Sequence, residues 1–240
     1  MTMGRPLLVL AGGSGSRLRP VVSDVPKAMA PVGDFPFLHY QLRNWTAQGQ
    51  RSFVFLLHHK AEAIVAYLTE QHRRLLSGCT VDCVIEPAPL DTGGAVAYAV
   101  RKLGLSGDIL LTNADTWLGA GIQELSGASA PAIAVVLQTD SSRYGQVRFA
   151  GDMTVEAFIE KTANAGSGWI NAGLSRLRAE VFSEWDGAPL SLERTTFVDL
   201  AAQHVLKAVP LSTDFIDIGV PEDYRRFCAW VQTGQEQGEL

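Results

Sequence analysis

The stretch that decides the fold is a glycine-rich turn close to the N-terminus, and it reads Leu10-Ala11-Gly12-Gly13-Ser14-Gly15-Ser16-Arg17-Leu18-Arg19-Pro20. An apolar run, Leu7–Ala11, leads into the turn and has the length of a buried strand. Open α/β folds bind ligands at the carboxyl ends of their strands, where this turn would lie. Three glycines in four positions allow the backbone to approach a ligand and point its amides at phosphate oxygens. The turn therefore predicts an anion-binding site, with a flexible turn that binds nothing as the alternative.

Two better-known phosphate loops do not fit this stretch. A P-loop requires Lys and then Ser or Thr after its last glycine, but Gly15 is followed by Ser16-Arg17. A dinucleotide-binding turn starting at Gly13 requires Gly or Ala where Leu18 stands. It also requires an acid at the end of the second strand, where the sequence has His58-His59. Leu18 and the missing acid argue against a nicotinamide-dependent oxidoreductase.

Outward from the turn, apolar runs of strand length alternate with helical patterns. Strands are predicted over Leu7–Ala11, Ser52–Leu57, Val81–Ile85 and Asp108–Thr112, and helices over Phe37–Ala47, Ala61–Gln71 and Gly93–Leu103. Such alternation is typical of right-handed βαβ units. We therefore predict an α/β fold, a Rossmann-like three-layer sandwich with a mainly parallel sheet and helices on both faces.

After Pro131 the pattern changes to strands separated by turns. Strands are predicted over Ala132–Gln138, Gly145–Ala150, Thr154–Ile159 and Trp169–Leu177, and helices over Arg194–Leu206 and Glu222–Val231. No Pro/Ser-rich linker separates the two parts. We expect one domain over residues 1–240, in which residues 1–130 form a nucleotide-binding half and residues 131–240 bring further strands to the same cleft.

Composition excludes several classes of protein. Hydrophobic residues make up 47% of the 240 residues and charged residues 19%, which suits a buried core. A net charge of −5 gives no overall basic field for nucleic acid or an anionic membrane. No apolar run approaches the roughly 18 residues of a spanning helix. The cysteines are three in number, and Cys79 and Cys83 lack a second pair at zinc-site spacing, so we expect reduced thiols and a cytoplasmic protein.

The turn also resembles the signature of the sugar-1-phosphate nucleotidyltransferase family, Gly-Gly-x-Gly-Thr/Ser-Arg-Leu followed by a Pro-Lys pair, here Pro26-Lys27. The resemblance extends nearly to the end of the chain and implies the nucleotide-diphospho-sugar transferase fold. It also implies transfer of a nucleoside monophosphate from a triphosphate to a sugar 1-phosphate, with release of pyrophosphate. In the family the backbone of the turn wraps the triphosphate, which assigns this role to Leu10, Ala11, Gly12, Gly13, Ser14, Gly15 and Ser16. By the same resemblance, Arg17 and Lys27 hold phosphate charge as catalytic residues.

Two aspartates match the positions of the family's Mg²⁺ ligands. Asp115 follows the predicted strand Asp108–Thr112, and Asp217 begins a stretch, Asp217-Ile218-Gly219-Val220-Pro221-Glu222-Asp223-Tyr224, that resembles the family's terminal motif. Magnesium prefers oxygen ligands and keeps several waters, so two carboxylates suffice. Taken alone, each aspartate would more often cap a turn or helix, the role expected for Asp223. The metal hypothesis requires both carboxylates to face one cleft.

The resemblance assigns further residues to the two substrates. The stretch Glu86–Ala95 resembles the family's base-recognition turn, and its nucleotide-binding candidates are Glu86, Thr92, Gly93 and Gly94. A helix start capped by Thr92 is the structural alternative. The sugar-phosphate candidates are Tyr144, Gly145, Glu160, Lys161, Asn171 and Gly173. For Tyr144 the alternative is a core position, and for Asn171 a structural hydrogen bond.

Within the family, the stretches Val21–Lys27, Met29–Val32, Pro36–Leu38 and Trp169–Gly173 resemble D-glycero-D-manno-heptose 1-phosphate guanylyltransferases. This implies GTP and a heptose 1-phosphate as substrates. The chain departs from the family pattern at Ser16, Asp91, Ala114 and Thr195. The alternatives are a uridylyl- or other nucleotidyltransferase for a different sugar, and a non-catalytic sugar-nucleotide-binding regulatory subunit. The sequence leaves the oligomeric state open, including a homo-oligomer.

Overall fold

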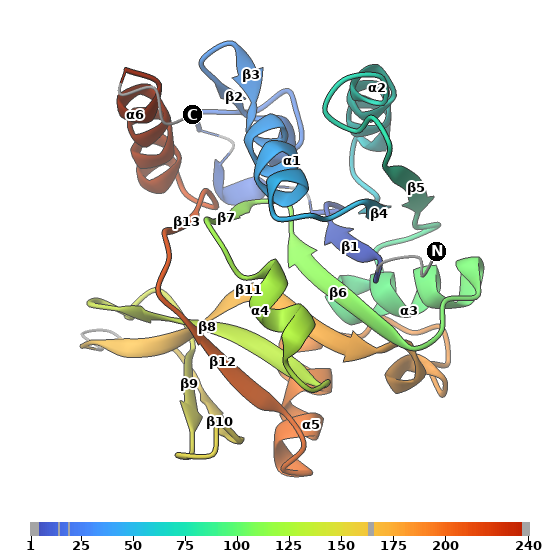
Figure 1. Ribbon diagram of the computed structural model, residues 1–240, viewed down its shortest axis with the longest axis vertical. Coiled ribbons are helices and arrows are strands. Elements are labelled where there is room, and N and C mark those ends of the chain that lie inside the picture. Colours follow the sequence, from blue (N-terminus) through green and yellow to red (C-terminus); the bar gives the residue numbers. More distant parts are fainter. Residues whose placement is uncertain (1–4, 14, 19, 163–165, 237–240) are drawn as a thin grey trace.

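The computed structural model of the chain describes residues 5–13, 15–18, 20–162 and 166–236. Within these residues, one nine-stranded sheet runs in the order β10-β9-β11-β6-β1-β4-β5, with β8 joined to β11 and β12 joined to β8 (Figure 1). Its parallel part consists of β1 (Leu7–Leu10), β4 (Ser52–Leu57), β5 (Thr80–Ile85) and β6 (Asp108–Asn113). Because β1 lies between β4 and β6, the glycine-rich turn leaves the sheet near its middle.

Alternation of side chains along these strands builds a layer of helices on each face. Leu7 and Val9 pack on one face with α1 (Phe37–Ala47), α2 (Ala61–Gln71) and α4 (Ile122–Gly127). Leu8 packs on the other face with α3 (Asp91–Leu103) and α5 (Phe197–Ala202). A period of two is what a strand buried on both faces requires. The predicted three-layer α/β fold is therefore confirmed. No helix of the described residues is both long and apolar enough to cross a membrane.

The second half adds β8 (Ala132–Gln138), β9 (Gln146–Phe149), β10 (Val155–Ile159), β11 (Gly168–Arg178) and β12 (Lys207–Leu211) to the same sheet. Here β11 runs antiparallel to both β6 and β8, so it joins the two halves of the chain. The helix predicted over Arg194–Leu206 is wrong in extent. A π-helix over Leu192–Thr196 leads into α5, which ends at Ala202 because His204 adopts a positive φ of 57° and the chain then enters β12. The other predicted strands and helices are all present.

A third group of elements packs beside the sheet. It consists of the hairpin β2 (Pro31–Val32) and β3 (Phe35–Pro36), the antiparallel pair β7 (Thr116–Leu118) and β13 (Phe215–Asp217), and helix α6 (Pro221–Glu236). Three 3₁₀ turns cover Ser16–Leu18, Lys27–Met29 and Ala179–Phe182. Trp117, Ile216, Ile218 and Phe227 form the core that holds this group together. Figure 1 shows α6 following directly from β13, on the side of the molecule that carries the hairpin.

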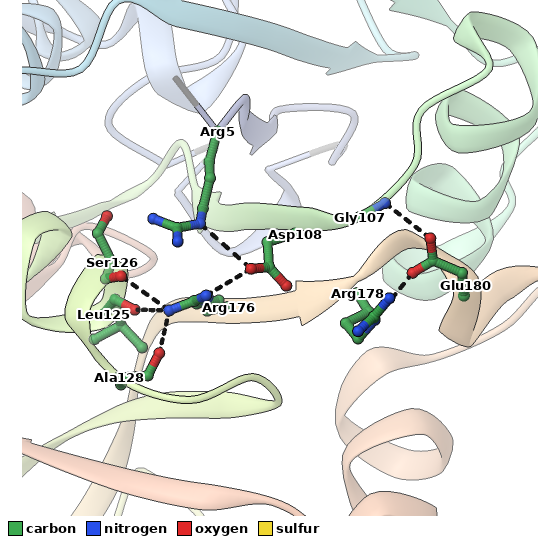
Figure 2. Close-up of polar contacts among 9 residues, drawn as sticks. All are labelled: Arg5, Gly107, Asp108, Leu125, Ser126, Ala128, Arg176, Arg178 and Glu180. Atoms are coloured by element: carbon green, nitrogen blue, oxygen red, sulfur yellow. Dashed lines mark hydrogen bonds and ion pairs between the residues drawn. The ribbon is translucent and has the colours of Figure 1, made fainter. Parts of the chain in front are cut away.

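At the start of β6, a buried arginine braces the sheet against α4 (Figure 2). One terminal nitrogen of Arg176 lies 2.5 Å from Oδ2 of Asp108, and Nε of Arg5 lies 3.5 Å from the same oxygen. The other terminal nitrogen of Arg176 donates to backbone carbonyls at the end of α4, those of Leu125, Ser126 and Ala128. Carbonyls at the end of a helix lack the amide donors of a following turn, so the arginine acts as a cap. The hydrogen bond from Arg176 is the main reason that the pKa of Asp108 is lowered.

Candidate functional site

The carboxyl ends of β1 and β6 open into a cleft of about 550 Å³. Its walls come from the glycine-rich turn, the loop after β4, residues 86–95 and the end of β6. Five residues predicted to bind nucleotide lie on these walls, namely Leu10, Gly12, Gly13, Glu86 and Thr92. Ala11 lines a small adjoining cavity together with Lys27 and Asp115. The structure thus gathers the predicted residues at the position where open α/β sheets bind ligands.

Two glycines of the turn, Gly12 and Gly15, are needed for close packing. A Cβ atom at Gly12 would lie 2.9 Å from Oε1 of Glu86. Gly15 has a φ of +64°, and its Cβ would lie 2.9 Å from Cγ of Lys27. Larger residues at these two positions would push Glu86 and Lys27 out of place. Ser14 lies outside the described residues, and so does the side chain of Ser16.

Lys27 and Asp115 form an ion pair in the small cavity that adjoins the cleft. Nζ of Lys27 lies 2.8 Å from Oδ2 of Asp115, and the two side chains are 17% and 31% exposed. Lys27 begins the 3₁₀ turn that follows Pro26, and its neighbour Ala28 is buried, which fixes the backbone beneath the lysine. Arg17 is exposed on the glycine-rich turn, and its charge reaches Asp217.

The pairing of β7 with β13 brings the two predicted metal ligands together. Asp217 lies opposite Thr116 in this pair, and the amide of Ile218 donates to the carbonyl of Asp115 at 2.9 Å. Ile216 and Ile218 are buried on either side of Asp217, so its half-buried side chain points away from their core. Burial raises the pKa of Asp217, and the negative charge of Asp115 raises it further against the opposing effects of Gly219, Lys27 and Arg17. The two carboxylates are therefore close enough for their charges to interact, and their binding of a metal stays a prediction.

Glu86 is almost fully buried beside the cleft. Its Oε2 accepts a hydrogen bond of 3.0 Å from the amide of Leu90. Burial is the main cause that raises its pKa. The carboxyl group therefore shapes the turn that follows it, and its predicted contact with a nucleotide stays a prediction.

Thr92, Gly93 and Gly94 contact a segment of the chain that the sequence analysis did not connect with them. The hydroxyl of Thr92 donates to Oε2 of Glu193 at 2.8 Å, and it does not cap α3, which begins one residue earlier. The alternative of a helix start capped by Thr92 is therefore wrong. The amides of Gly93 and Gly94 donate to the carbonyl of Leu190 at 2.7 and 3.0 Å. A Cβ at Gly93 would lie 2.9 Å from Leu190, so this glycine allows α3 and the segment before the π-helix to touch.

Four of the sugar-phosphate candidates lie at one end of the β9–β10 hairpin. Ile159 pairs with Gln146, so Tyr144-Gly145 precedes β9 where Glu160-Lys161 follows β10. Tyr144 is half-buried, and its ring lies 5.7 Å from that of Phe215 on β13. Glu160 and Lys161 are exposed. The hairpin therefore carries these residues toward the strand that ends at Asp217.

Asn171 and Gly173 form an irregularity in β11. The amide of Gly173 donates to Oδ1 of Asn171 at 3.0 Å, which is the structural hydrogen bond considered as its alternative role. Gly173 has a φ of +75°, and its Cβ would lie 2.8 Å from Nδ2 of Asn113. Asn113 ends β6 and lines the cleft, yet the sequence analysis passed over it. A polar residue at the carboxyl end of a buried strand was the signal available.

Asp223 does not act as the helix cap that its position predicted. Its side chain is 5% exposed and forms ion pairs with Arg143 and, at 3.5 Å, with Arg226. Asp223 is the third residue of α6, whereas Arg143 belongs to the loop before β9. Arg143 was not singled out from the sequence, since its partner lies 80 residues away.

Comparison with known proteins gives matches that cover most of the chain. Residues 7–236 match the family model described as Nucleotidyl transferase. The chain is 31% identical over 225 residues to D-glycero-alpha-D-manno-heptose 1-phosphate guanylyltransferase of Campylobacter jejuni, covering 92% of this chain and 97% of that protein. It is also 31% identical to a probable mannose-1-phosphate guanylyltransferase of Oryza sativa, covering 90% of this chain but 62% of that protein. The crystal structure of HddC from Yersinia pseudotuberculosis complexed with GMP-PN superposes with a TM-score of 0.81 at 30% identity, covering 95% of this chain and 99% of HddC.

Proposed function

Because the chain belongs to the nucleotidyl transferase family, we propose that it transfers GMP from GTP to a sugar 1-phosphate, with D-glycero-D-manno-heptose 1-phosphate as the preferred acceptor. The observation that carries the proposal is the meeting of Asp115, Asp217 and Lys27 at one end of the nucleotide cleft. The guanine base is supported by the names of the relatives and by the GMP-PN complex of HddC. The heptose is supported by coverage, since the chain matches 97% of the heptose enzyme and 62% of the mannose enzyme.

The proposed reaction joins two strongly anionic molecules. An oxygen of the sugar phosphate attacks the α-phosphorus of GTP in line, a P–O bond forms to the sugar phosphate, and the bond between the α-phosphorus and the bridging oxygen breaks. Pyrophosphate leaves with that electron pair, and GDP-sugar remains. A phosphate oxygen is already ionised at neutral pH, so no general base is needed. Catalysis therefore depends on positioning and on positive charge, which Arg17 and Lys27 supply from the turn side of the cleft.

The pair of carboxylates fits a magnesium ion. Asp115 and Asp217 offer hard oxygen ligands, and repulsion between them leaves negative charge that Lys27 and Arg17 only partly offset. Magnesium keeps several of its waters, so two carboxylates are enough to hold it. When bound, the ion would neutralise phosphate charge and help to hold the phosphates of the two substrates together. The protein's own part is to hold both aspartates facing the cleft through the β7–β13 pair.

The test is a matrix of substrates with purified protein. GTP, UTP, ATP and CTP are each combined with heptose, mannose, glucose and N-acetylglucosamine 1-phosphates in the presence of Mg²⁺, and pyrophosphate release is measured. We expect the highest kcat/KM for GTP with the heptose phosphate, and GTP with mannose 1-phosphate is the strongest competitor. A maximum with UTP would overturn the base assignment alone. Binding of GDP-sugar without turnover of any pair would favour the regulatory subunit instead.

A further inference from the structure

Asp223 is a buried acid that the proposed reaction does not use. Its side chain is 5% exposed, and both of its carboxylate oxygens are paired, Oδ2 with Arg143 and Oδ1 with Arg226. Arg226 lies one turn further along the same helix, whereas Arg143 comes from the loop before β9. An acid is kept buried only when it is paired. The pair with Arg143 thus ties the sugar-side loop to α6.

The guanidinium of Arg143 lies beside the end of the β9–β10 hairpin that carries the sugar-phosphate candidates. It lies 5.6 Å above the ring of Tyr144, whose other neighbour is Phe215 on β13. Continuing the β9–β10 register by two residues on each strand would set Tyr144 opposite Lys161. The hydrogen bond to Asp223 is the main cause that raises the pKa of Arg143, and the charge of Asp217 acts in the same direction. The positive charge of Arg143 therefore acts on Asp217, and its neighbour Tyr144 lies at the same end of the β9–β10 hairpin as Lys161.

The hydrogen bond to Asp223 uses only part of the donor capacity of the Arg143 guanidinium. The side chain of Arg143 is 43% exposed, although one of its nitrogens is held by the buried acid. The guanidinium carries five N–H donors in a fixed plane, and Asp223 accepts from one nitrogen only. Donors held in place yet open to solvent are suited to a phosphate group, which arginine binds through two parallel hydrogen bonds.

We propose that Arg143 binds the phosphate of the sugar 1-phosphate together with Lys161, and that Asp223 is the positioning residue that aims it. The inference rests on the proposed function, because it assigns a residue to the acceptor of that reaction. The rival explanation is a purely structural pair that fastens the loop to α6. The two differ in one measurable respect: a structural pair would alter stability or both substrates alike, whereas a phosphate ligand alters the acceptor alone.

The experiment compares Arg143→Ala, Arg143→Lys and Arg226→Ala by steady-state kinetics, with each substrate varied in turn. For Arg143→Ala we expect KM for the sugar 1-phosphate to rise by about 10- to 100-fold, the effect of losing a charged hydrogen bond. KM for GTP should change by no more than about twofold, and Arg143→Lys should recover part of the loss because it restores the charge. Arg226→Ala is the matched control, since it removes the other ion pair of Asp223 from an exposed position and should leave both KM values nearly unchanged.

A second variant tests the positioning role. Asp223→Asn keeps an acceptor oxygen but removes the charge, and it should raise KM for the sugar 1-phosphate while a thermal melt shows the fold intact. If Asp223→Asn fails to fold, the Arg143 pair of variants decides the matter. Equal rises in KM for both substrates in Arg143→Ala, or no rise in either, would overturn the inference while pyrophosphate release by the parent upholds the proposed function. If the parent turns over no pair of substrates, both fall together.

Discussion

An aspartate lies at each end of strand β6, and the two aspartates differ in the charge of the groups around them. Asp108 begins the strand and faces the guanidinium groups of Arg176 and Arg5. Asp115 lies two residues past the end of the strand. It forms an ion pair with Lys27 and lies near a second acid, Asp217. The pKa of Asp108 is lowered, mainly by its hydrogen bond to Arg176, whereas the pKa of Asp217 is raised by burial and by Asp115.

This difference separates a structural acid from a functional one. At the start of β6, two cations face one carboxylate, so the charge is satisfied within the protein and the interaction stabilises the fold. At the other end, two partly buried carboxylates lie close together, and burial and their mutual repulsion raise the pKa of Asp217, so this arrangement costs free energy. Functional sites are often built against the stability of the fold in this manner. The predictions below test whether the two ends really differ in this respect.

The largest expected effect is on catalysis at the Asp115 end. Asp115→Asn should lower kcat/KM for pyrophosphate release by roughly 10³-fold, the scale found when one strong electrostatic contact is removed from a transition state. The melting temperature should change little, because the loss of the pair with Lys27 is offset by relief of repulsion with Asp217. Kinetics and a thermal melt on the same preparation measure both quantities.

Asp108→Asn is the matched control at the other end of the strand. It removes the same charge at the opposite end of β6, but we expect it to lower the melting temperature and to leave kcat/KM within about twofold, since Asp108 lies at the end of the strand away from the cleft. If Asp108→Asn lost activity while Asp115→Asn kept it, the two ends would have been assigned the wrong way round.

The next effect concerns the free energy of unfolding at the start of β6. Arg176→Met fills the volume but leaves Asp108 with Arg5 alone and the carbonyls at the end of α4 without their donor, so we expect a loss of about 2 kcal/mol at pH 7. Because the folded-state pKa of Asp108 is lowered, its contribution is present above the unfolded-state value of about 3.9 and disappears as the pH falls through the folded-state value. Urea titrations should therefore show the difference between variant and parent shrinking below about pH 4. A gap that is independent of pH would mean that packing, not charge, holds this end together.

A smaller effect is expected from magnesium itself. The raised pKa of Asp217 means that its stabilising contribution is present below the unfolded-state pKa and lost as the pH rises through the folded-state value. At neutral pH a cation should restore stability, by about 1.4 kcal/mol at ten times its Kd, or roughly 3–6 °C in melting temperature. Asp217→Asn should not respond to Mg²⁺, and sodium chloride of equal ionic strength should not replace the ion for the parent. An equal response in Asp217→Asn would place the ion elsewhere.

The sequence predicted the elements well where burial dictates pattern. Strands β1, β4 and β6 are buried on both faces, so their apolar runs could be identified without knowledge of their neighbours. The reach of the helix predicted over Arg194–Leu206 was missed because the positive φ of His204 and the pairing of β12 with β8 depend on tertiary context. The motif positions of Asp115 and Asp217 came from resemblance to a family.

What brings the site together could not be predicted from local sequence. The aspartates meet through β7 and β13, strands of three residues that are too short to show a period. Asp223 was assigned to a helix cap because its partner Arg143 is 80 residues away. Gly93 was predicted to contact the nucleotide, and nothing in the local sequence indicated that its amide donates to the carbonyl of Leu190. In each case the deciding contact joins segments that are distant in the sequence. Local secondary-structure propensity does not predict such contacts.

The smallest predicted effect concerns Asp91. Like Asp115 it lines the cleft, and like Asp108 it pairs with an arginine. It stands where the family has glycine, its φ is +60°, and its Oδ2 pairs with Arg194, which is 77% exposed. Asp91→Gly removes that pair, worth up to about 1 kcal/mol, and the hydrogen bond that the amide of Thr92 donates to Oδ1, but it relieves a left-handed strain of about the same size. We therefore expect the free energy of unfolding to change by less than about 1 kcal/mol and the preference for GTP over UTP to persist. Asp91→Asn keeps the side-chain oxygen without the charge and so isolates the ion pair. A tenfold or larger change in the ratio of kcat/KM for GTP to kcat/KM for UTP, seen in Asp91→Gly alone, would assign Asp91 a functional role. It would show that the exposed pair with Arg194 shapes the pocket for the base.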